Sequence, residues 1–310
     1  MSLLVIGSVA FDAIDTPFGS TGKIVGGAAS YISLATTLLH KHVGLVAVVG
    51  EDFDFEFVET LKSRGTDVSG LQIKLGEKSF FWHGKYHMDM NSRDTLVTEL
   101  NVLGDFDPVV PEHWQEPDFV MLGNLSPQVQ LTTLNRLSRK PKLVVLDTMN
   151  FWMDIALDDL KTVLKRVDVL TVNDEEARQL SGEYSLVKAA RTIRAMGPKT
   201  LIIKKGEHGA LLFGTDDQNQ EQLFFCPALP LEEVFDPTGA GDTFAGGFIG
   251  YLASVGRTDF EAMKTAIVYG SAMASYCVEQ FGTTKLSAIT QDDLKFRLLQ
   301  FKSLMAVETN

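Results

Sequence analysis

Residues 236–247 have the sequence DPTGAGDTFAGG, in which three small residues directly precede the acidic Asp242. A long run of small and apolar residues follows over 243–255 and predicts a buried helix. A helix that begins here directs its first free backbone N–H groups at whatever lies above residues 239–241. The positive end of the helix dipole adds to these donors, so this stretch predicts an anion site.

Asp242 indicates which reaction this anion site supports. A carboxylate beside a phosphate-sized anion is disfavoured by charge repulsion, unless it takes the proton of a hydroxyl that attacks the phosphate. The motif resembles the C-terminal signature of the ribokinase-like (PfkB) carbohydrate kinase family. The resemblance implies ATP-dependent phosphorylation of a sugar-type hydroxyl, with Asp242 as general base and the N–H groups of Gly239, Ala240 and Gly241 as the anion hole. The alternative is a glycine-rich turn that only begins a tightly packed helix.

The composition is that of an ordinary globular protein, with 45% hydrophobic and 22% charged residues in 310. This length suits one large α/β domain, and no linker divides the chain, so we expect a single ribokinase-like domain over 1–310. A net charge of −12 without a Lys/Arg cluster argues against nucleic acid as a partner. Two cysteines, no signal-peptide core and no membrane-length apolar run predict a soluble, cytoplasmic protein without a membrane partner.

Short apolar runs alternate with helical stretches through the first two thirds of the chain. The runs lack strict alternation, which is typical of strands that are covered on both faces. The order predicts a three-layer α/β/α fold with a mostly parallel central sheet. Expected strands are 3–6, 45–49, 119–122, 143–146, 169–172, 201–203, 210–213 and 223–226; expected helices are 28–39, 55–64, 127–139, 155–164, 175–180, 243–255, 260–280 and 291–305.

Residues 71–103 break this pattern with a β-prone segment that includes Phe81, Trp82 and Tyr86. Together with residues 12–25 this segment can form a small separate sheet, although the residues alone equally allow a hairpin at the edge of the main sheet. The resemblance favours the first interpretation, a β-sheet lid over the sugar site. Exposed edges of such a lid are compatible with a homodimer.

Gly26 and Gly27 precede the first long helix and permit close approach of a ligand to the backbone. The resemblance implies that they bind the sugar together with Asp12, whose carboxylate accepts hydrogen bonds from hydroxyls. A turn that packs the helix is the alternative. Residues 28–31 depart from the family pattern, because Tyr31 and its neighbours stand where many members carry asparagine, which leaves the substrate class open.

Asn173 and Glu176 follow the strand expected over 169–172, at the edge of the sheet where ligands of α/β proteins bind. Their spacing is similar to the Asn-x-x-Glu element of the family. The resemblance implies that they help to hold Mg²⁺ and the ATP phosphates, mostly through water. They also suit a helix N-cap with an acidic first turn, and both roles can hold together.

The resemblance also assigns nucleotide contacts to two glycines. Gly206 is the nucleotide-contacting glycine, and Gly282 borders the adenine pocket or is a plain helix C-cap. The lysine pair 204–205 can face phosphates or water, and it receives no role. Asp236 and Thr238 can supply oxygens to a monovalent cation such as K⁺, as in some relatives, but the sequence leaves this undecided.

These features predict a kinase that uses ATP and Mg²⁺ on a small sugar or sugar-like molecule. A nucleoside kinase of the same family is the first alternative, because aromatic side chains near Trp82 can stack on a base. A metabolite-binding regulator with the same fold and no turnover is the second. The intact Asp242 argues against a regulator, because pure binding gains nothing from a carboxylate beside an anion hole.

Overall fold

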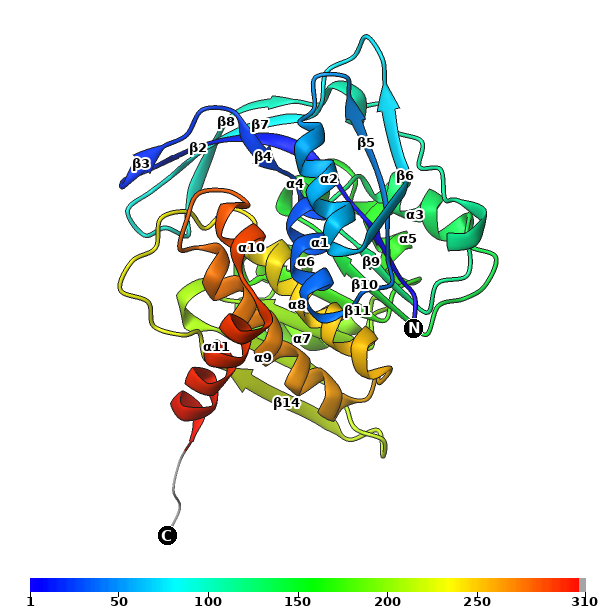
Figure 1. The fold of residues 1–310 in the computed structure, drawn as a ribbon. Helices are drawn as coiled ribbons and strands as arrows, with labels where there is room; N and C mark the ends of the chain where they lie inside the picture. The colour runs from blue at the N-terminus through cyan, green and yellow to red at the C-terminus, as the bar shows by residue number, and fades with distance from the viewer. Residues whose placement is uncertain (307–310) are drawn as a thin grey trace.

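The structure, a computed structural model, describes residues 1–306 and is built on a nine-stranded sheet (Figure 1). Neighbouring strands are parallel except in the pairs β12–β13 and β13–β14, which are antiparallel. The strand order is β14 (Glu221–Cys226), β13 (Ala210–Thr215), β12 (Thr200–Lys204), β11 (Val169–Asn173), β10 (Leu143–Asp147), β9 (Phe119–Leu122), β1 (Leu3–Ile6), β5 (Val43–Gly50) and β6 (Thr66–Lys74).

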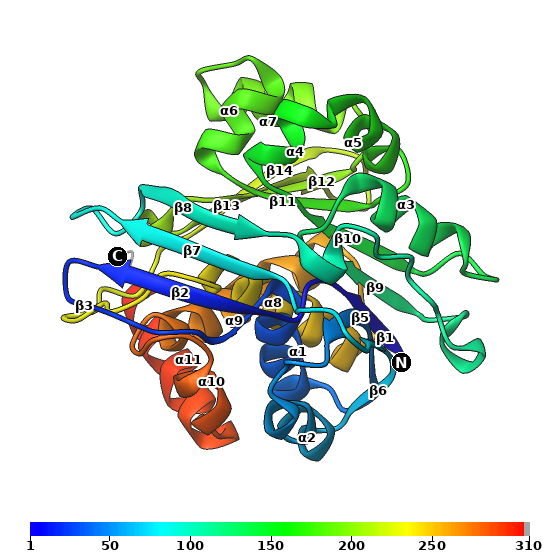
Figure 2. The same cartoon turned by 90° about the horizontal axis from the view of Figure 1, so that it is seen from above.

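Helices cover both faces of this sheet, as Figure 2 shows from above. One face carries α1 (Ala28–Leu39), α2 (Phe55–Arg64), α8 (Ala240–Val255), α9 (Phe260–Cys277), α10 (Thr284–Ala288) and α11 (Gln291–Met305). The other face carries α3 (Pro127–Asn135), α4 (Asn150–Ile155), α5 (Leu157–Leu164), α6 (Asp174–Ser181) and α7 (Leu186–Arg194). Within residues 1–306, none of the helices combines the length and the apolar character that crossing a membrane requires.

Strand β1 shows why the expected strands lack polar alternation. Leu3 and Val5 point into the core cluster under α1 and α8, whereas Leu4 and Ile6 point into the cluster on the opposite face. All four side chains are fully buried. The three-layer prediction is confirmed, since a sheet with helices on both faces requires apolar residues at every position of its central strands.

A second, smaller sheet crosses the carboxyl edge of the large one (Figure 2). The chain leaves β1 at Ile6 and enters the small sheet at Ala10, so this sheet begins where the carboxyl end of β1 stops. Strands β2 and β7 are parallel, and the remaining pairs are antiparallel. Its strands are β3 (Gly19–Ser20), β2 (Ala10–Thr16), β7 (Phe81–Tyr86) and β8 (Arg93–Glu99) in that order, with β4 (Ile24–Gly26) paired to β2.

Several boundaries differ from the expected ones. Residues 71–74, expected in the lid, belong to β6, because they continue its parallel ladder with β5 in the large sheet. The helix expected over 127–139 ends at Asn135. The helix expected over 155–164 begins at Leu157, because Ala156 leaves the helical region with φ −144°. The separate helix α4 before it was not expected. Helices α7 and α10 were not expected either; α7 follows Ser185 without a side-chain cap hydrogen bond, and α10 has only five residues.

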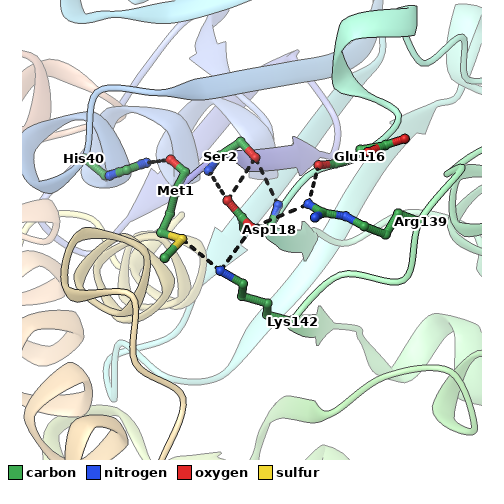
Figure 3. Close-up of polar contacts among 7 residues, drawn as sticks. All are labelled: Met1, Ser2, His40, Glu116, Asp118, Arg139 and Lys142. Carbon is green, nitrogen blue, oxygen red and sulfur yellow. Dashed lines mark hydrogen bonds and ion pairs between the residues drawn. The ribbon is translucent and has the colours of Figure 1, made fainter.

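The amino edge of the sheet is held together by the first residues of the chain (Figure 3). Ser2 N–H donates to Asp118 Oδ2 at 3.0 Å, and Asp118 N–H donates to Ser2 Oγ at the same distance. Lys142 Nζ lies 3.2 Å from Asp118, and His40 Nε2 lies 2.7 Å from the carbonyl oxygen of Met1. These contacts join the beginnings of β1, β9 and β10. The second sheet covers the opposite, carboxyl edge of the large sheet.

Candidate active site

Helix α8 begins beneath the second sheet with Gly239 as N-cap in the left-handed region, at φ 75° and without a side-chain cap. Ala240 N–H donates to Pro237 O at 3.2 Å, which closes the turn. Within residues 1–306, the N–H groups of Gly239, Gly241 and Asp242 have no hydrogen-bond acceptor. The beginning of α8 therefore directs free donors at one point, and the dipole of a 16-residue helix adds to them.

Glycine is required at position 239 for two reasons. A φ of 75° disfavours every residue with a Cβ, and a Cβ there would lie 2.5 Å from ring atoms of Tyr31. Tyr31 belongs to α1, which packs against α8. The turn of the DPTGAGD motif is therefore set by the tyrosine that faces it across the two helices.

Asp242 lies in the first turn of α8 and is half-buried. Its Oδ1 is buried and has no hydrogen-bond partner in the described part of the chain. Burial, followed by the negative charge of Asp147, raises the pKa of Asp242, while Lys204 and Arg93 oppose the shift. A carboxylate with a raised pKa and a free oxygen is suited to take a proton from a hydroxyl.

A buried ion pair lies beside the beginning of α8. Lys204 Nζ, from the end of β12, is 2.9 Å from Asp147 Oδ1, from the end of β10. Thr171 Oγ1 on β11 donates to the same carboxylate oxygen at 2.5 Å. Burial alone would lower the pKa of Lys204, but Asp147 and Glu176 raise it above its ordinary value, so this lysine is a fixed cation among carboxylates.

Asn173 and Glu176 form a capping box at the beginning of α6. Asn173 N–H donates to Glu176 Oε2 at 2.8 Å, and Glu176 N–H donates to Asn173 Oδ1 at 2.7 Å. The helix-capping interpretation therefore holds. Burial raises the pKa of Glu176 to about 7, although the charge of Lys204 opposes the shift. Glu176 and the Lys204–Asp147 pair thus belong to one charged cluster.

This cluster fits a metal ion only if phosphate oxygens supply part of the ligands. No group of three or more His, Cys, Asp or Glu residues within residues 1–306 is placed to hold a metal ion by itself. Magnesium bound with a nucleotide keeps several waters and takes one or two protein carboxylates together with phosphate oxygens. Glu176 and Asp147 are the two carboxylates of this cluster, and both act on the pKa of Lys204.

Asp12, Gly26 and Gly27 meet where the second sheet joins α1. A Cβ on Gly26 would lie 1.8 Å from Asp12 Oδ2, so the carboxylate lies directly on the glycine backbone. Gly27 is the N-cap of α1 at φ 88°. Burial and then the negative charge of Asp236 raise the pKa of Asp12 to about 7. The carboxylate of Asp12 thus lies in the same charged region as Asp236 and Asp242.

Asp236 holds the turn before α8 through both of its oxygens. Thr238 N–H donates to Oδ1 and Gly282 N–H donates to Oδ2, each at 2.8 Å. Thr238 Oγ1 lies 3.2 Å from the hydroxyl of Tyr86 on β7. A Cβ on Gly282 would meet Ile24 of the second sheet at 2.7 Å. Asp236, Thr238 and Gly282 therefore form one loop contact beneath the second sheet.

Gly206 is separate from that loop and lies under the tip of the β7–β8 hairpin. It has φ 54°, and a Cβ there would lie 2.2 Å from Asn91 Oδ1 in the hairpin turn. The hairpin thus spans from Tyr86, beside Thr238, to the loop after β12 that carries Gly206. The second sheet touches both parts of the candidate site.

Sequence reasoning missed Asp147 and Thr171, left Lys204 without a role and did not consider Arg93. A usable signal was present, because Asp147 and Lys204 end neighbouring buried strands of a parallel sheet. The carboxyl ends of such strands meet at one edge, where ligands bind. Arg93 gave no comparable signal, since its approach to Asp242 depends on how the second sheet lies over the first.

Comparisons with known proteins find a family and relatives that match most of the chain. The model of the pfkB family carbohydrate kinases matches residues 2–290. The chain is 35% identical over 274 residues to the cytidine kinase of Thermococcus kodakarensis, covering 86% of this chain and 94% of the relative. It is 28% identical over 268 residues to the 2-dehydro-3-deoxygluconokinase of Thermoproteus tenax, covering 80% of each.

A solved structure has the same fold. It is the aminoimidazole riboside kinase of Salmonella enterica, complexed with aminoimidazole riboside and an ATP analog. The TM-score is 0.73 at 24% identity, and the match covers 96% of this chain and 100% of that one. The fold of the large sheet and the small second sheet is therefore one that solved kinases share.

Proposed function

The chain belongs to the pfkB family of carbohydrate kinases, and we propose that it transfers the γ-phosphoryl group of ATP to a hydroxyl of a sugar or sugar-like molecule. The observation that carries this proposal is Asp242, a half-buried carboxylate with a raised pKa and an unpartnered oxygen, beside the free N–H groups at the beginning of α8. One arrangement thus combines a base with an anion hole, which is what phosphoryl transfer to a hydroxyl needs.

In this proposal Asp242 takes the proton of the attacking hydroxyl. The N–H groups of Gly239 and Gly241 donate to the oxygens of the phosphoryl group as its charge develops, and Ala240 holds the turn. Lys204 keeps its positive charge because of Asp147, and it lies within reach of the same point, since a Cβ on Gly241 would be 3.0 Å from its Nζ. These donors offset the charge that develops as the phosphoryl group moves.

We assign the nucleotide to the side of the site that holds Asn173, Glu176 and Gly206. Mg²⁺ bound with ATP would supply neutralisation of the phosphate charge, and Glu176 and Asn173 would hold it, mostly through water. Gly206 offers a backbone surface beside the sheet edge, and Gly282 stays assigned to the nucleotide only on the family resemblance. K⁺ at Asp236 and Thr238 also stays a proposal.

We assign the acceptor to Asp12, Gly26 and Gly27, beneath the second sheet. Asp12 would accept hydrogen bonds from substrate hydroxyls and hold one of them toward Asp242. A nucleoside acceptor is a second candidate, and the 35% identity to a cytidine kinase is the observation that supports it. Both candidates share the same transfer step and differ only in the molecule that carries the hydroxyl.

The test is acceptor-dependent ADP formation from MgATP with unphosphorylated pentoses and hexoses, sugar phosphates, sugar acids and nucleosides. We expect turnover on one class of acceptor, and a decrease of about 100- to 10,000-fold for Asp242→Asn, with ATP binding retained. Asp158→Asn, which removes an exposed carboxylate on α5, is the matched control and should leave turnover unchanged.

Two outcomes would contradict the proposal. Unchanged turnover in Asp242→Asn would remove Asp242 from the chemistry. ATP binding without ADP formation on any acceptor would favour a metabolite-binding regulator that kept the fold.

A further inference from the structure

A hollow lies at the amino edge of the large sheet, on the face that carries α3, α5 and α7. Its lining residues belong to 134–144, 165–168 and 197–199, which lead into β10, β11 and β12. Its volume is about 420 Å³, within the range of about 300–1,000 Å³ that is typical of small-molecule sites. These three strands reach the candidate active site at their other ends, about 16 Å away at about 3.3 Å per residue. This amino-edge hollow is therefore separate from that site.

The walls of the amino-edge hollow are basic, although the chain has a net charge of −12. Among the described residues that line it, five are cationic and one, Asp168, is a carboxylate. Asp168 Oδ2 accepts a hydrogen bond from Val144 N–H at 2.9 Å, so it is engaged with the backbone beneath the hollow. Three segments that are far apart in the chain supply the positive charge, and it forms no run in the sequence. The cations are Arg139, Lys140, Lys165, Arg166 and Lys199.

Three lysines of the hollow have no carboxylate to neutralise them. Within residues 1–306, Lys140, Lys165 and Lys199 form no ion pair. The negative end of the helix dipole accounts for Lys165, which is the C-cap of α5. It does not account for Lys140 and Lys199, because each lies five residues beyond the end of a helix and the dipole acts only within the last turn.

The two arginines of the hollow are only partly engaged. Arg166 donates to the neutral Asn135 Oδ1 at 3.1 Å. Arg139 donates to Glu116 O at 2.9 Å, and its guanidinium lies 3.5 Å from Asp118 Oδ1 (Figure 3). Cationic side chains around a concave surface raise the local concentration of anions, and they form charge-assisted hydrogen bonds with phosphate oxygens. The walls are thus suited to an anionic ligand.

The floor of the hollow is apolar, and its loops are fixed by the backbone. A Cβ on Gly197 would lie 2.2 Å from Leu164 O, so the loop before β12 packs directly on the end of α5. Small-molecule sites typically combine an apolar surface with a few polar groups. Inorganic phosphate would leave this floor unused, whereas a phosphate ester with an apolar ring would cover it. The apolar residues are Leu134, Leu137, Pro141, Val144 and Val167.

We propose that the amino-edge hollow is a second ligand site, which binds a small organic phosphate of the size of a nucleoside monophosphate. Its phosphate group would contact Lys140, Lys165 and Lys199, and its ring would lie on the apolar floor. A long nucleic acid fits less well, because the acidic remainder of the protein repels a chain of phosphates. The proposal goes beyond the kinase reaction and does not depend on it, since none of these residues belongs to the candidate active site.

The test reads binding at the hollow itself through the reactivity of its lysines. The full chain is acetylated with a reactive ester in the presence of AMP, CMP, inorganic phosphate or adenosine, and peptide mass spectrometry measures the rate at each lysine. AMP or CMP should slow the acetylation of Lys140, Lys165 and Lys199. Lys188, exposed on α7, should react at an unchanged rate. Inorganic phosphate should protect the three lysines at least about tenfold more weakly, and adenosine should not protect them.

Two double variants then test the role of the charges. The protection of Lys165 at increasing nucleotide concentration gives the affinity of the hollow. This affinity should fall about tenfold or more in Lys140→Gln/Lys199→Gln. The matched control is Lys188→Gln/Lys302→Gln, which removes the same charge from exposed positions on α7 and α11 and should keep the wild-type affinity.

Four outcomes would overturn the proposal. They are protection by neither nucleotide, equal affinities in the two double variants, protection by phosphate or adenosine as strong as by the nucleotide, and protection by a short single-stranded RNA at lower concentration than either nucleotide. Loss of ADP formation in the kinase assay would leave all of these measurements unaffected, so the two proposals fail separately.

Discussion

The two halves of the site are built in opposite ways. The proposed phosphoryl-transfer half combines the beginning of α8 with the ends of β10 to β12, where Asp147 and Thr171 are buried. The acceptor half is covered by the small sheet, whose outer strand β8 is exposed at every residue. The proposed transfer half therefore lies against the large, helix-covered sheet, whereas the proposed acceptor half is covered by a thin sheet with an exposed outer strand.

The first prediction concerns the buried ion pair and carries the largest expected effect. Lys204→Met leaves Asp147 and Glu176 without their cation, so the free energy of unfolding should fall by about 3–5 kcal/mol. Urea unfolding of the purified variant measures it. Lys205→Met, which changes the neighbouring lysine, is the matched control, and the double variant Asp147→Asn/Lys204→Met should recover part of the loss. If Lys204→Met and Lys205→Met lose the same free energy of unfolding, the Lys204–Asp147 pair does not stabilise the protein.

The second prediction separates the cost of backbone strain at a glycine with positive φ from the cost of a steric clash with its neighbour. Gly239→Ala should cost about 2–4 kcal/mol of stability, because it combines φ 75° with a contact of 2.5 Å to Tyr31. Gly76→Ala, before β7, has nearly the same φ of 76° but nothing within 4 Å of the new Cβ, so only about 1 kcal/mol is expected. Thermal unfolding of both variants measures the difference. A loss in Gly76→Ala as large as in Gly239→Ala would mean that the tyrosine contact has no role.

The third prediction is a pH dependence on the acceptor side. The pKa of Asp12 rises from 3.8 to about 7 on folding, so the folded protein keeps a proton that the unfolded chain loses. The contribution of Asp12 to the free energy of unfolding therefore falls as the pH rises between 4 and 7. Asp12→Asn removes this pH dependence. The free energy of unfolding of the variant minus that of the wild type should therefore increase by about 2–3 kcal/mol from pH 5 to pH 8. A constant difference between the two unfolding curves over this range would contradict the prediction.

The fourth prediction has the smallest effect on stability and concerns the exposed edge of the second sheet. Strand β8 ends the sheet, and its Leu96 is 49% exposed. We expect two copies to pair along this edge, with light scattering showing a dimer that Leu96→Lys converts to a monomer at a cost below about 0.5 kcal/mol. Leu299→Lys, at an exposed leucine on α11, should leave the dimer intact. A wild-type monomer would contradict the prediction.

The two halves also differ in how far they could be predicted. The DPTGAGD stretch predicted a helix beginning, an anion site and a base, because a glycine turn followed by a small-residue helix has few structural interpretations. The alternation of apolar runs with helical stretches predicted the three layers, because both patterns are local in the sequence. The second sheet was harder: residues 71–74 of β6 were expected in it and residues 66–70 were not expected as a strand, because a half-buried edge strand of the large sheet and a strand of the small one have similar residue patterns.

The sequence by itself determined the layered α/β architecture, the family and the place where α8 begins, because these depend on local periodicity and on residues that are adjacent in the chain. Only the tertiary structure decided which side chains meet. The pairing of Lys204 with Asp147 and the contact of Tyr31 with Gly239 join residues that are far apart in the sequence. The shared carboxyl edge of the parallel strands brings the first pair together, and the packing of α1 against α8 brings the second pair together. No local pattern records either geometry.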